Sequence, residues 1–197
     1  MPGKNHHQSC IFWYNPHMRK DICGLKSLGN RVEAPMTYDP SVLEAFANRN
    51  ADRDYWVTFT APEFTTLCPK TGQPDFATLT IRYVPGKKLV ESKSLKLYLF
   101  GFRNNGDFHE DVVNVIYDDL KKLLKPKYME VFGKFAARGG ITIDPFVNGG
   151  DGAKWKALAA RRFNEWSGVR SRTSSGADEV MGHNRHERQD HDDVDPG

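Results

Sequence analysis

Residues 76–102 read FATLTIRYVPGKKLVESKSLKLYLFGF, and the spacing of their apolar side chains changes along the stretch. Up to Val84, every second residue is apolar, which predicts a half-buried β-strand over 76–84. After the turn signal Pro85-Gly86, apolar residues stand at positions 95, 98, 99 and 102, which is the spacing of one helix face. This stretch therefore predicts a strand followed by a helix.

Further elements are predicted on both sides of this stretch. Residues 39–46 are a short helix candidate, with Asp39 as its N-cap and Pro40 as its first residue. Strands are predicted over 55–60, 128–135 and 141–146, a second helix over 107–125, and a terminal helix over 155–166. The main elements follow the order strand, strand, helix, helix, strand, strand. This order predicts an α+β fold in which two helices cover one face of an antiparallel sheet. The open edges of such a sheet favour closure by oligomerisation.

Composition and charge suit one folded domain with polar ends. The chain has 197 residues and a formal net charge of +3, which does not favour nucleic-acid binding by bulk electrostatics. We expect an irregular extension over 1–22, one domain over 23–167 and a polar tail over 168–197. One hypothesis for the extension is that Met18 is the true start. No apolar run approaches the roughly 20 residues of a membrane-spanning helix, and residues 1–9 lead into no apolar segment of a secretory signal, so we expect neither feature.

Cysteine and histidine usage argues against disulfides and structural metal sites. The three cysteines, Cys10, Cys23 and Cys68, lack the C-x-x-C spacing of zinc ligands and fit a reducing cytoplasm. Histidines in the tail, at positions 183, 186 and 191, could bind a metal loosely, but a solvated polar sequence is the better explanation.

The predicted loop over 64–76 carries one thiol and one carboxylate. Two prolines fix backbone angles in it, so the loop is stiffer than its length suggests. Cys68 is a candidate nucleophile, provided that its surroundings, with help from Lys70, lower the pKa of its thiol. Asp75 could deliver or accept a proton in the same loop. The alternative is a plain connection in which a small, half-buried residue happens to be cysteine.

Three further stretches offer polar groups to a ligand. Residues 91–96 suit a helix N-terminus capped by one of their two serines, or a site for a polar ligand or a phosphate. Glu110 completes a capping box at the start of the second helix, or its two oxygens accept hydrogen bonds from a guanine-like base. Residues 138–140 form a hairpin turn, or bring an arginine and bare backbone to an anionic cofactor.

Four stretches occur in the order and spacing of one family: LCPKTGQPDF over 67–76, ESKSLKLY over 91–98, FHED over 108–111 and RGGITID over 138–144. Over residues 24–166 the chain closely resembles the single-domain NADPH-dependent 7-cyano-7-deazaguanine reductases, the QueF family of queuosine biosynthesis. The Glu-Ser-Lys-Ser-x-Lys signature separates these reductases from the related GTP cyclohydrolases, which use Cys and His ligands for zinc.

The resemblance implies a fold, an assembly and a chemistry. The fold would be the tunnelling fold, closed into a barrel by pentamer rings that stack into decamers, with active sites between subunits. Cys68 matches the nucleophile that attacks the substrate nitrile to give a covalent thioimide, and Asp75 matches the proton donor. The residues that match the deazaguanine pocket are Val90, Glu91, Ser92, His109 and Glu110. The positions that match NADPH contacts are Ser92, Lys93, Arg138 and Gly139. Two hydrides from two NADPH molecules would complete the reduction, in the cytoplasm and without a metal.

Two other functions stay open at this point. One is a non-catalytic tunnelling-fold protein that binds a purine or a pterin. The other is a zinc-dependent, cyclohydrolase-like enzyme, which the missing zinc ligands disfavour.

Overall fold

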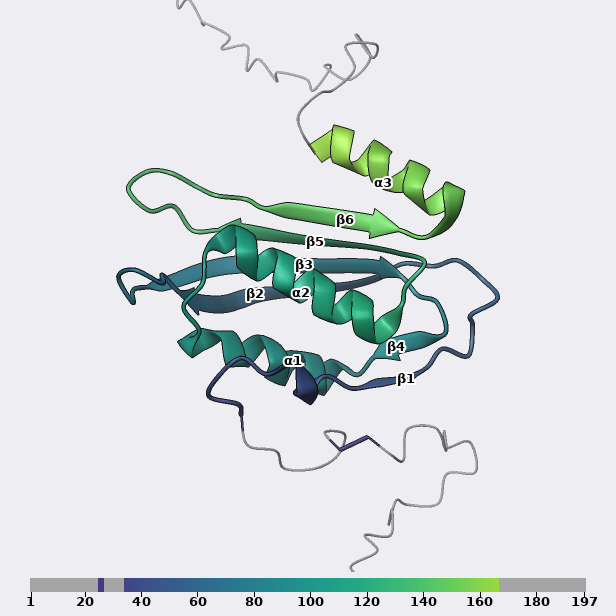
Figure 1. The fold of residues 1–197 in the computed structure, drawn as a ribbon, viewed down its shortest axis with the longest axis horizontal. Helices are drawn as coiled ribbons and strands as arrows, with labels where there is room; N and C mark the ends of the chain where they lie inside the picture. The colour runs from purple at the N-terminus through teal and green to yellow at the C-terminus, as the bar shows by residue number, and fades with distance from the viewer. Residues whose placement is uncertain (1–24, 27–33, 167–197) are drawn as a thin grey trace, which may run out of the picture.

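The computed structural model describes residues 25–26 and 34–166. The predicted extension over 1–22, the predicted tail over 168–197 and the cysteines Cys10 and Cys23 lie outside the described residues. The main sheet has four antiparallel strands. Helices pack against it (Figure 1). The predicted α+β class is therefore confirmed.

The main sheet is antiparallel throughout. Its strands, in order across the sheet, are β2 (Val57–Leu67), β3 (Pro74–Val84), β5 (Tyr128–Phe135) and β6 (Phe146–Gly150). In the two ladders on either side of β3, Phe59 lies opposite Ile81, and Ile81 lies opposite Val131. A second, two-stranded sheet pairs β1 (Ala45–Ala47) with β4 (Lys88–Val90). Within the described chain, β2 and β6 are the edges of the main sheet.

Two helices cover one face of the main sheet (Figure 1). They are α1 (Ser92–Phe100), which continues into the short 3-10 helix η3 (Gly101–Asn104), and α2 (His109–Leu124). The apolar stripe of α2 is buried, as its sequence predicts: Val113, Ile116, Tyr117, Leu120 and Leu124. These side chains join the inward-facing residues of β3 and β5 in one hydrophobic core. Removal of this apolar surface from water is the main force that holds the helices on the sheet.

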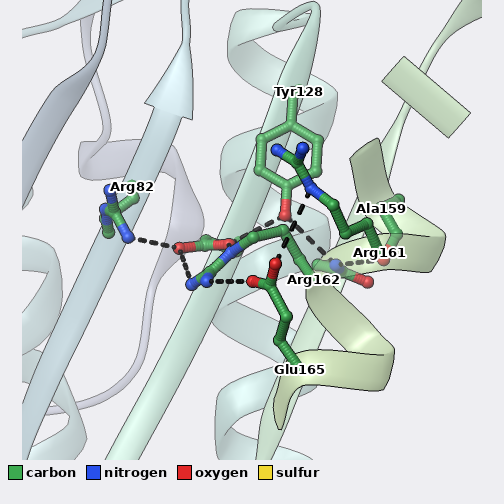
Figure 2. Close-up of polar contacts among 8 residues, drawn as sticks. Arg82, Tyr128, Ala159, Arg161, Arg162 and Glu165 are labelled. Atoms are coloured by element: carbon green, nitrogen blue, oxygen red, sulfur yellow. Dashed lines mark hydrogen bonds and ion pairs between the residues drawn. The ribbon is translucent and has the colours of Figure 1, made fainter. Parts of the chain in front are cut away.

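A third helix, α3 (Gly152–Trp166), packs against the other face of the sheet. Met129 of β5 belongs to the core, so its neighbour Glu130 points to the opposite face. Glu130 is 3 % exposed and accepts hydrogen bonds from Arg82 Nη1 of β3 and Arg162 Nε of α3, both at 3.0 Å. Figure 2 shows how these groups join the helix to the sheet. The buried carboxylate therefore connects α3 to two strands at once.

The connection between β2 and β3 is shorter than the predicted loop over 64–76. Strand β2 begins at Val57 and continues to Leu67, and β3 begins at Pro74, so that only Cys68–Gln73 link the two strands. The prediction of a long loop was wrong for two reasons. Thr65 and Thr66 favour strand structure, so β2 continues to Leu67, and β3 can begin at Pro74 because proline is tolerated at the first residue of a strand.

Two other element predictions were wrong. Only Pro40–Val42 are helical, as a 3-10 turn (η2) whose cap is Asp39; Ala45–Ala47 pair instead with Lys88–Val90. The last strand is Phe146–Gly150 and not 141–146, because Ile141 pairs only with Arg138, in an isolated bridge. The terminal helix and the strand over 128–135 are confirmed. Among the described residues, no helix combines the length and the apolar content that crossing a bilayer requires.

Candidate active site

The residues that join β2 to β3 form a loop closed by backbone hydrogen bonds. The N–H of Cys68 donates to the carbonyl of Gln73 at 2.8 Å, and the N–H of Gly72 donates to the carbonyl of Cys68 at 2.9 Å. Gly72 has a φ of 66°, a left-handed conformation that glycine adopts without steric cost. Cys68 is half-buried at the start of this loop. Its position is therefore set by the hairpin and not by a flexible connection.

Asp75, at the start of β3, is buried and held from two sides. Its Oδ1 accepts from Arg138 Nη1 at 2.7 Å, and its Oδ2 lies 3.1 Å from His109 Nε2. The His109 ring stacks on Phe135 with the ring centroids 4.0 Å apart, and its Nδ1 is buried with no hydrogen-bond partner in the described structure. Arg138 also donates through Nη2 to Gln73 Oε1 at 3.1 Å. The guanidinium thus links the loop to the carboxylate.

The surroundings of Cys68 lower the pKa of its thiol from 9.0 to about 6. The largest cause is a hydrogen bond with the Thr71 side chain, followed by the backbone N–H groups of Thr71 and Lys70 and by the Arg138 guanidinium. Donors and a cation favour the ionised form of a thiol. In return, the sulfur of Cys68 and the carboxylate of Asp75 raise the pKa of Arg138. The sequence predicts that Lys70 helps to lower the pKa of the Cys68 thiol, and it does so through its backbone N–H.

The start of α2 is fixed beside the same loop. The N–H of Leu67 donates to the carbonyl of Asn105 at 3.0 Å, and the N–H of Asp107 donates to the carbonyl of Leu67 at 3.1 Å. The Asp107 carboxylate accepts from the N–H of Phe108 and does not cap α2. The predicted capping box is therefore wrong, and Glu110 is exposed at the start of the helix, near His109.

Glu91 is the N-cap of α1, in place of the serine that the sequence predicted. Its Oε1 accepts from the N–H of Lys93 at 3.0 Å, and its Oε2 accepts from the N–H of Ser94 at 2.6 Å. Glu91 is 4 % exposed. A buried carboxylate is tolerated here because two helix N–H groups and the positive end of the helix dipole compensate its charge.

Val90, Glu91 and Ser92 line a pocket that does not include Cys68. The pocket has a volume of about 500 Å³, and aromatic side chains such as Tyr55 and Phe59 contribute to its wall. Helix α1 and η3 run from this pocket to Asn105, which pairs with Leu67 next to Cys68. The length of α1 and η3 therefore separates the two groups of predicted site residues within one chain.

Residues 138–140 form the predicted tight turn. Gly139 and Gly140 have φ values of 58° and 81°, and the backbones of Arg138 and Ile141 pair across the turn. A Cβ atom added at either glycine would meet no atom within 4 Å, so the backbone here is open to a ligand. An arginine beside open backbone N–H groups fits the phosphates of a dinucleotide. Across residues 25–26 and 34–166, no group of three or more His, Cys, Asp or Glu side chains could hold a metal ion.

Comparisons with known proteins bear on this arrangement. The family profile described as "QueF-like protein" matches residues 74–154. A Neisseria gonorrhoeae (strain NCCP11945) protein named NADPH-dependent 7-cyano-7-deazaguanine reductase is 57% identical over 148 residues, which cover 74% of this chain and 94% of the relative. The chain belongs to this reductase family.

Other members of the NADPH-dependent 7-cyano-7-deazaguanine reductase family match equally well. The protein of that name from Alkaliphilus metalliredigens is 56% identical over 149 residues, covering 75% of this chain and 89% of the relative. The one from Bacillus licheniformis is 57% identical over 149 residues, covering 74% and 90%. A solved structure, the archaeosine synthase QueF-Like in the apo form, is more distant, with a TM-score of 0.46 and 17% identity over 50% of this chain and 96% of that chain.

Membership of the reductase family confirms the resemblance that the four sequence motifs indicate. The structure brings three of these motifs together, those at 67–76, 108–111 and 138–144, and leaves 91–98 apart. Two features of the site were missed: the contact of Thr71 with the thiol, and the pairing of Arg138 with Asp75. A hydroxyl just before a glycine turn, three residues after the cysteine, is a signal that could have pointed to Thr71.

Proposed function

We propose that this chain reduces the nitrile of 7-cyano-7-deazaguanine to an aminomethyl group, with NADPH as hydride donor, in queuosine biosynthesis. The observation that carries the proposal is the thiol of low pKa at Cys68, which shares one guanidinium with the buried carboxylate of Asp75. The names of the relatives support the substrate and the hydride donor. A thiolate and a proton donor are the two groups that covalent capture of a nitrile requires.

Capture of the nitrile uses Cys68 and Asp75 together. The thiolate forms a bond to the nitrile carbon, and one π electron pair of the carbon–nitrogen triple bond moves onto the nitrogen. Asp75 gives this nitrogen a proton, which leaves a covalent thioimide on Cys68. His109 lies 3.1 Å from the same carboxyl group and is placed to return a proton to it.

The remaining steps need two hydrides, which NADPH supplies when it is bound. After the first hydride reaches the thioimide carbon and the nitrogen takes up a proton, the carbon–sulfur bond breaks and its electron pair returns to Cys68 as thiolate. The imine that is left is already protonated on nitrogen, so the second hydride alone reduces it to the amine. In sum, one nitrile, two NADPH and two protons give one primary amine and two NADP⁺, and Cys68 is regenerated.

The recognition residues are assigned by their match to the family motifs. The deazaguanine pocket takes Val90, Glu91, Ser92, His109 and Glu110, and the NADPH contacts are Ser92, Lys93, Arg138 and Gly139. The exposed carboxylate of Glu110 supports its role as an acceptor for the paired N–H donors of the base. The open backbone at 138–140 supports a contact with the dinucleotide.

We infer the assembly from the same match to the family motifs. Residues 23–167 form a tunnelling-fold domain, which closes into a barrel of pentamer rings stacked as decamers, in the cytoplasm. The edge strands β2 and β6 support this proposal, because each leaves backbone groups available for pairing with another subunit. The separation of Glu91 from Cys68 within one chain supports a site that is shared between subunits.

Replacing the nucleophile tests the proposed function. Cys68→Ala should abolish both the NADPH oxidation that depends on 7-cyano-7-deazaguanine and the absorbance of the thioimide, because no group is left to capture the nitrile. Both signals are followed by absorbance in the full-length protein, with the unchanged protein alongside. Turnover by Cys68→Ala would end the covalent mechanism. If the unchanged protein bound the deazaguanine but consumed no NADPH, it would be the non-catalytic purine-binding protein instead.

A further inference from the structure

Ser94, in the first turn of α1, is buried and bonded to both the main chain and the side chain of Glu91. Its Oγ donates to the carbonyl of Glu91 at 2.8 Å and accepts from the N–H of Glu44 at 2.9 Å. Its own N–H donates to Oε2 of Glu91 at 2.6 Å. Because these groups are shielded from water, their hydrogen bonds restrict Glu91 strongly.

The hydroxyl of Ser94 also ties the start of α1 to the small sheet. The N–H of Glu91 donates to the carbonyl of Glu44 at 2.8 Å, directly before the pair in which Ala45 lies opposite Val90. The carbonyl of Glu91 accepts from the N–H of Leu95 at 3.0 Å, so it begins the helix. The Ser94 hydroxyl bonds both Glu91 and Glu44, and it therefore fixes the angle at which the helix leaves the strand pair.

The carboxylate that is held in this way keeps capacity for a ligand. An ionised carboxylate offers about four lone-pair sites. The N–H groups of Lys93 and Ser94 occupy one site on each oxygen of Glu91. The other sites can accept from the N–H donors of a base in the pocket that Glu91 lines. Such bonds depend on direction, so the orientation of Glu91 sets the affinity for the base.

We propose that Ser94 is a positioning residue of this pocket, which holds Glu91 in the orientation that binds the deazaguanine. The effect on binding rests on the proposed function, whereas the hold on Glu91 does not. Ser94 is not among the described residues that line the pocket, so it acts through Glu91. The alternative is that the hydroxyl only stabilises the start of α1, in which case its loss would lower the Tm and leave binding unchanged.

Ser94→Ala tests the proposal, because it removes the hydroxyl and keeps the N–H that bonds the Glu91 carboxylate. Binding of 7-cyano-7-deazaguanine is measured by calorimetry in full-length Cys68→Ala, so that no covalent bond forms. Adding Ser94→Ala should raise Kd about ten-fold, because the carbonyl of Glu91 and the N–H of Glu44 each lose a partner. With Cys68 intact, KM should rise by a similar factor while kcat changes less than about two-fold.

Ile116→Val is the matched control for stability. Ile116 is buried in the core on α2, and the loss of one methyl group there lowers the Tm without touching the pocket that Glu91 lines. Its Kd and KM should equal those of the unchanged protein. An equal loss of affinity in Ile116→Val and Ser94→Ala would show that general destabilisation weakens binding, and would overturn the proposal.

The hold on Glu91 is measured without a ligand, by amide hydrogen exchange. The N–H of Lys93 donates to Oε1 of Glu91, so it should exchange several-fold faster in Ser94→Ala than in the unchanged protein or in Ile116→Val. An unchanged Lys93 amide or an unchanged Kd in Ser94→Ala would also overturn the proposal. A faster Lys93 amide in a protein that neither binds nor reduces the nitrile would contradict the proposed function and leave the hold of Ser94 on Glu91 intact.

Discussion

At the scale of single residues, Arg138 connects the two reactive groups of the candidate site. Its guanidinium donates to Asp75 at 2.7 Å and contacts the sulfur of Cys68. One cation therefore faces two groups that are anions when ionised. Arg138 is 38% exposed whereas Asp75 is 2% exposed, so a ligand that arrives from solvent can reach the cation directly. Any anion that draws Arg138 away would change the charge balance at both reactive groups.

Removing this cation should make Cys68 harder to ionise. In Arg138→Met, the midpoint of thiol ionisation should rise above about 6, because the thiolate loses a cation and keeps the Asp75 carboxylate as a neighbour. The thiolate exists above the midpoint and is lost as pH falls through it, so the acid limb of the kcat/KM profile should move to higher pH. Both curves are measured on the full-length protein.

Arg138→Lys is the control for charge alone. Lysine keeps the positive charge but lacks the planar fork that holds Asp75 and Gln73 together, so its midpoint should lie between those of the unchanged protein and Arg138→Met. The same midpoint in all three proteins would show that Arg138 has no influence on the thiol.

The sequence predicts Cys68 and Asp75 as the reactive residues because their motif is specific, but it does not predict their partners. The contact between Asp75 and Arg138 could not be predicted from spacing, since it depends on the ladder between β3 and β5, which brings residues 63 positions apart together. The hydrogen bonds that close the loop between β2 and β3 could not be predicted either, because the sequence indicates a longer loop there.

At the scale of elements, the Glu130 cluster decides where α3 lies. In addition to the two arginines, the Tyr128 hydroxyl donates a hydrogen bond to Glu130 at 2.8 Å. The Asn148 amide in turn donates to that hydroxyl and to the carbonyl of Ala159 in α3 (Figure 2). Trp166 at the end of α3 also stacks on Phe146 of β6, with ring centroids 4.8 Å apart. Polar and aromatic contacts therefore hold both the middle and the end of the helix.

Glu130→Gln should weaken the attachment of α3. A buried ion pair that loses one partner costs about 3–5 kcal/mol, and because Arg82 and Arg162 can both reach water we expect about 2 kcal/mol here. For a chain of this size that corresponds to a fall in Tm of about 4–8 °C. Trypsin should also cut α3 faster, at the lysines and arginines that the docked helix protects.

Glu165→Gln is the matched control on α3 itself. Glu165 is 53% exposed and pairs with Arg162 at 3.0 Å, so its loss should change Tm by about 1 °C or less. Equal effects of the two substitutions would show that the burial of Glu130 does not matter.

Elements with a strong repeating pattern could be predicted, and short ones could not. The strand over 128–135 and the stripe of α2 are long enough for their period to show. The three-residue strand Ala45–Ala47 exists because Lys88–Val90 pairs with it, and a partner 43 positions away leaves no local signal. The predicted serine cap of α1 was wrong because the start of this helix is buried, where the Glu91 carboxylate accepts from two backbone N–H groups; the predicted cap Asp39 is confirmed.

At the scale of the whole molecule, the two groups of predicted site residues lie at different ends of α1 and η3. A site shared between subunits should therefore be restored by mixing two inactive proteins. Cys68→Ala and Glu91→Gln should each be inactive alone. When they are co-expressed with different tags and purified as mixed oligomers, roughly a quarter of the sites should combine an intact Cys68 with an intact Glu91, if subunits pair at random.

The two variants mixed after purification, without subunit exchange, are the control for this experiment and should stay inactive. Circular dichroism must show that Glu91→Gln is folded, because glutamine caps a helix less well than glutamate. Co-expressed oligomers with no activity would place Cys68 and Glu91 in the site of one and the same chain. The fold class could be predicted from element order, whereas the position of Glu91 relative to Cys68 needed three-dimensional coordinates.

The pairing of Leu67 with Asn105 and Asp107 has a consequence for how the protein opens. These bonds are the only described backbone link between the end of β2 and the segment before α2. When the two segments separate, both bonds break, so the amide hydrogens of Leu67 and Asp107 should show similar protection against exchange with solvent deuterium, relative to their intrinsic exchange rates. A ligand that binds at Cys68 should slow both amides to the same degree, so that protection of Asp107 reports occupancy of a site to which it does not belong.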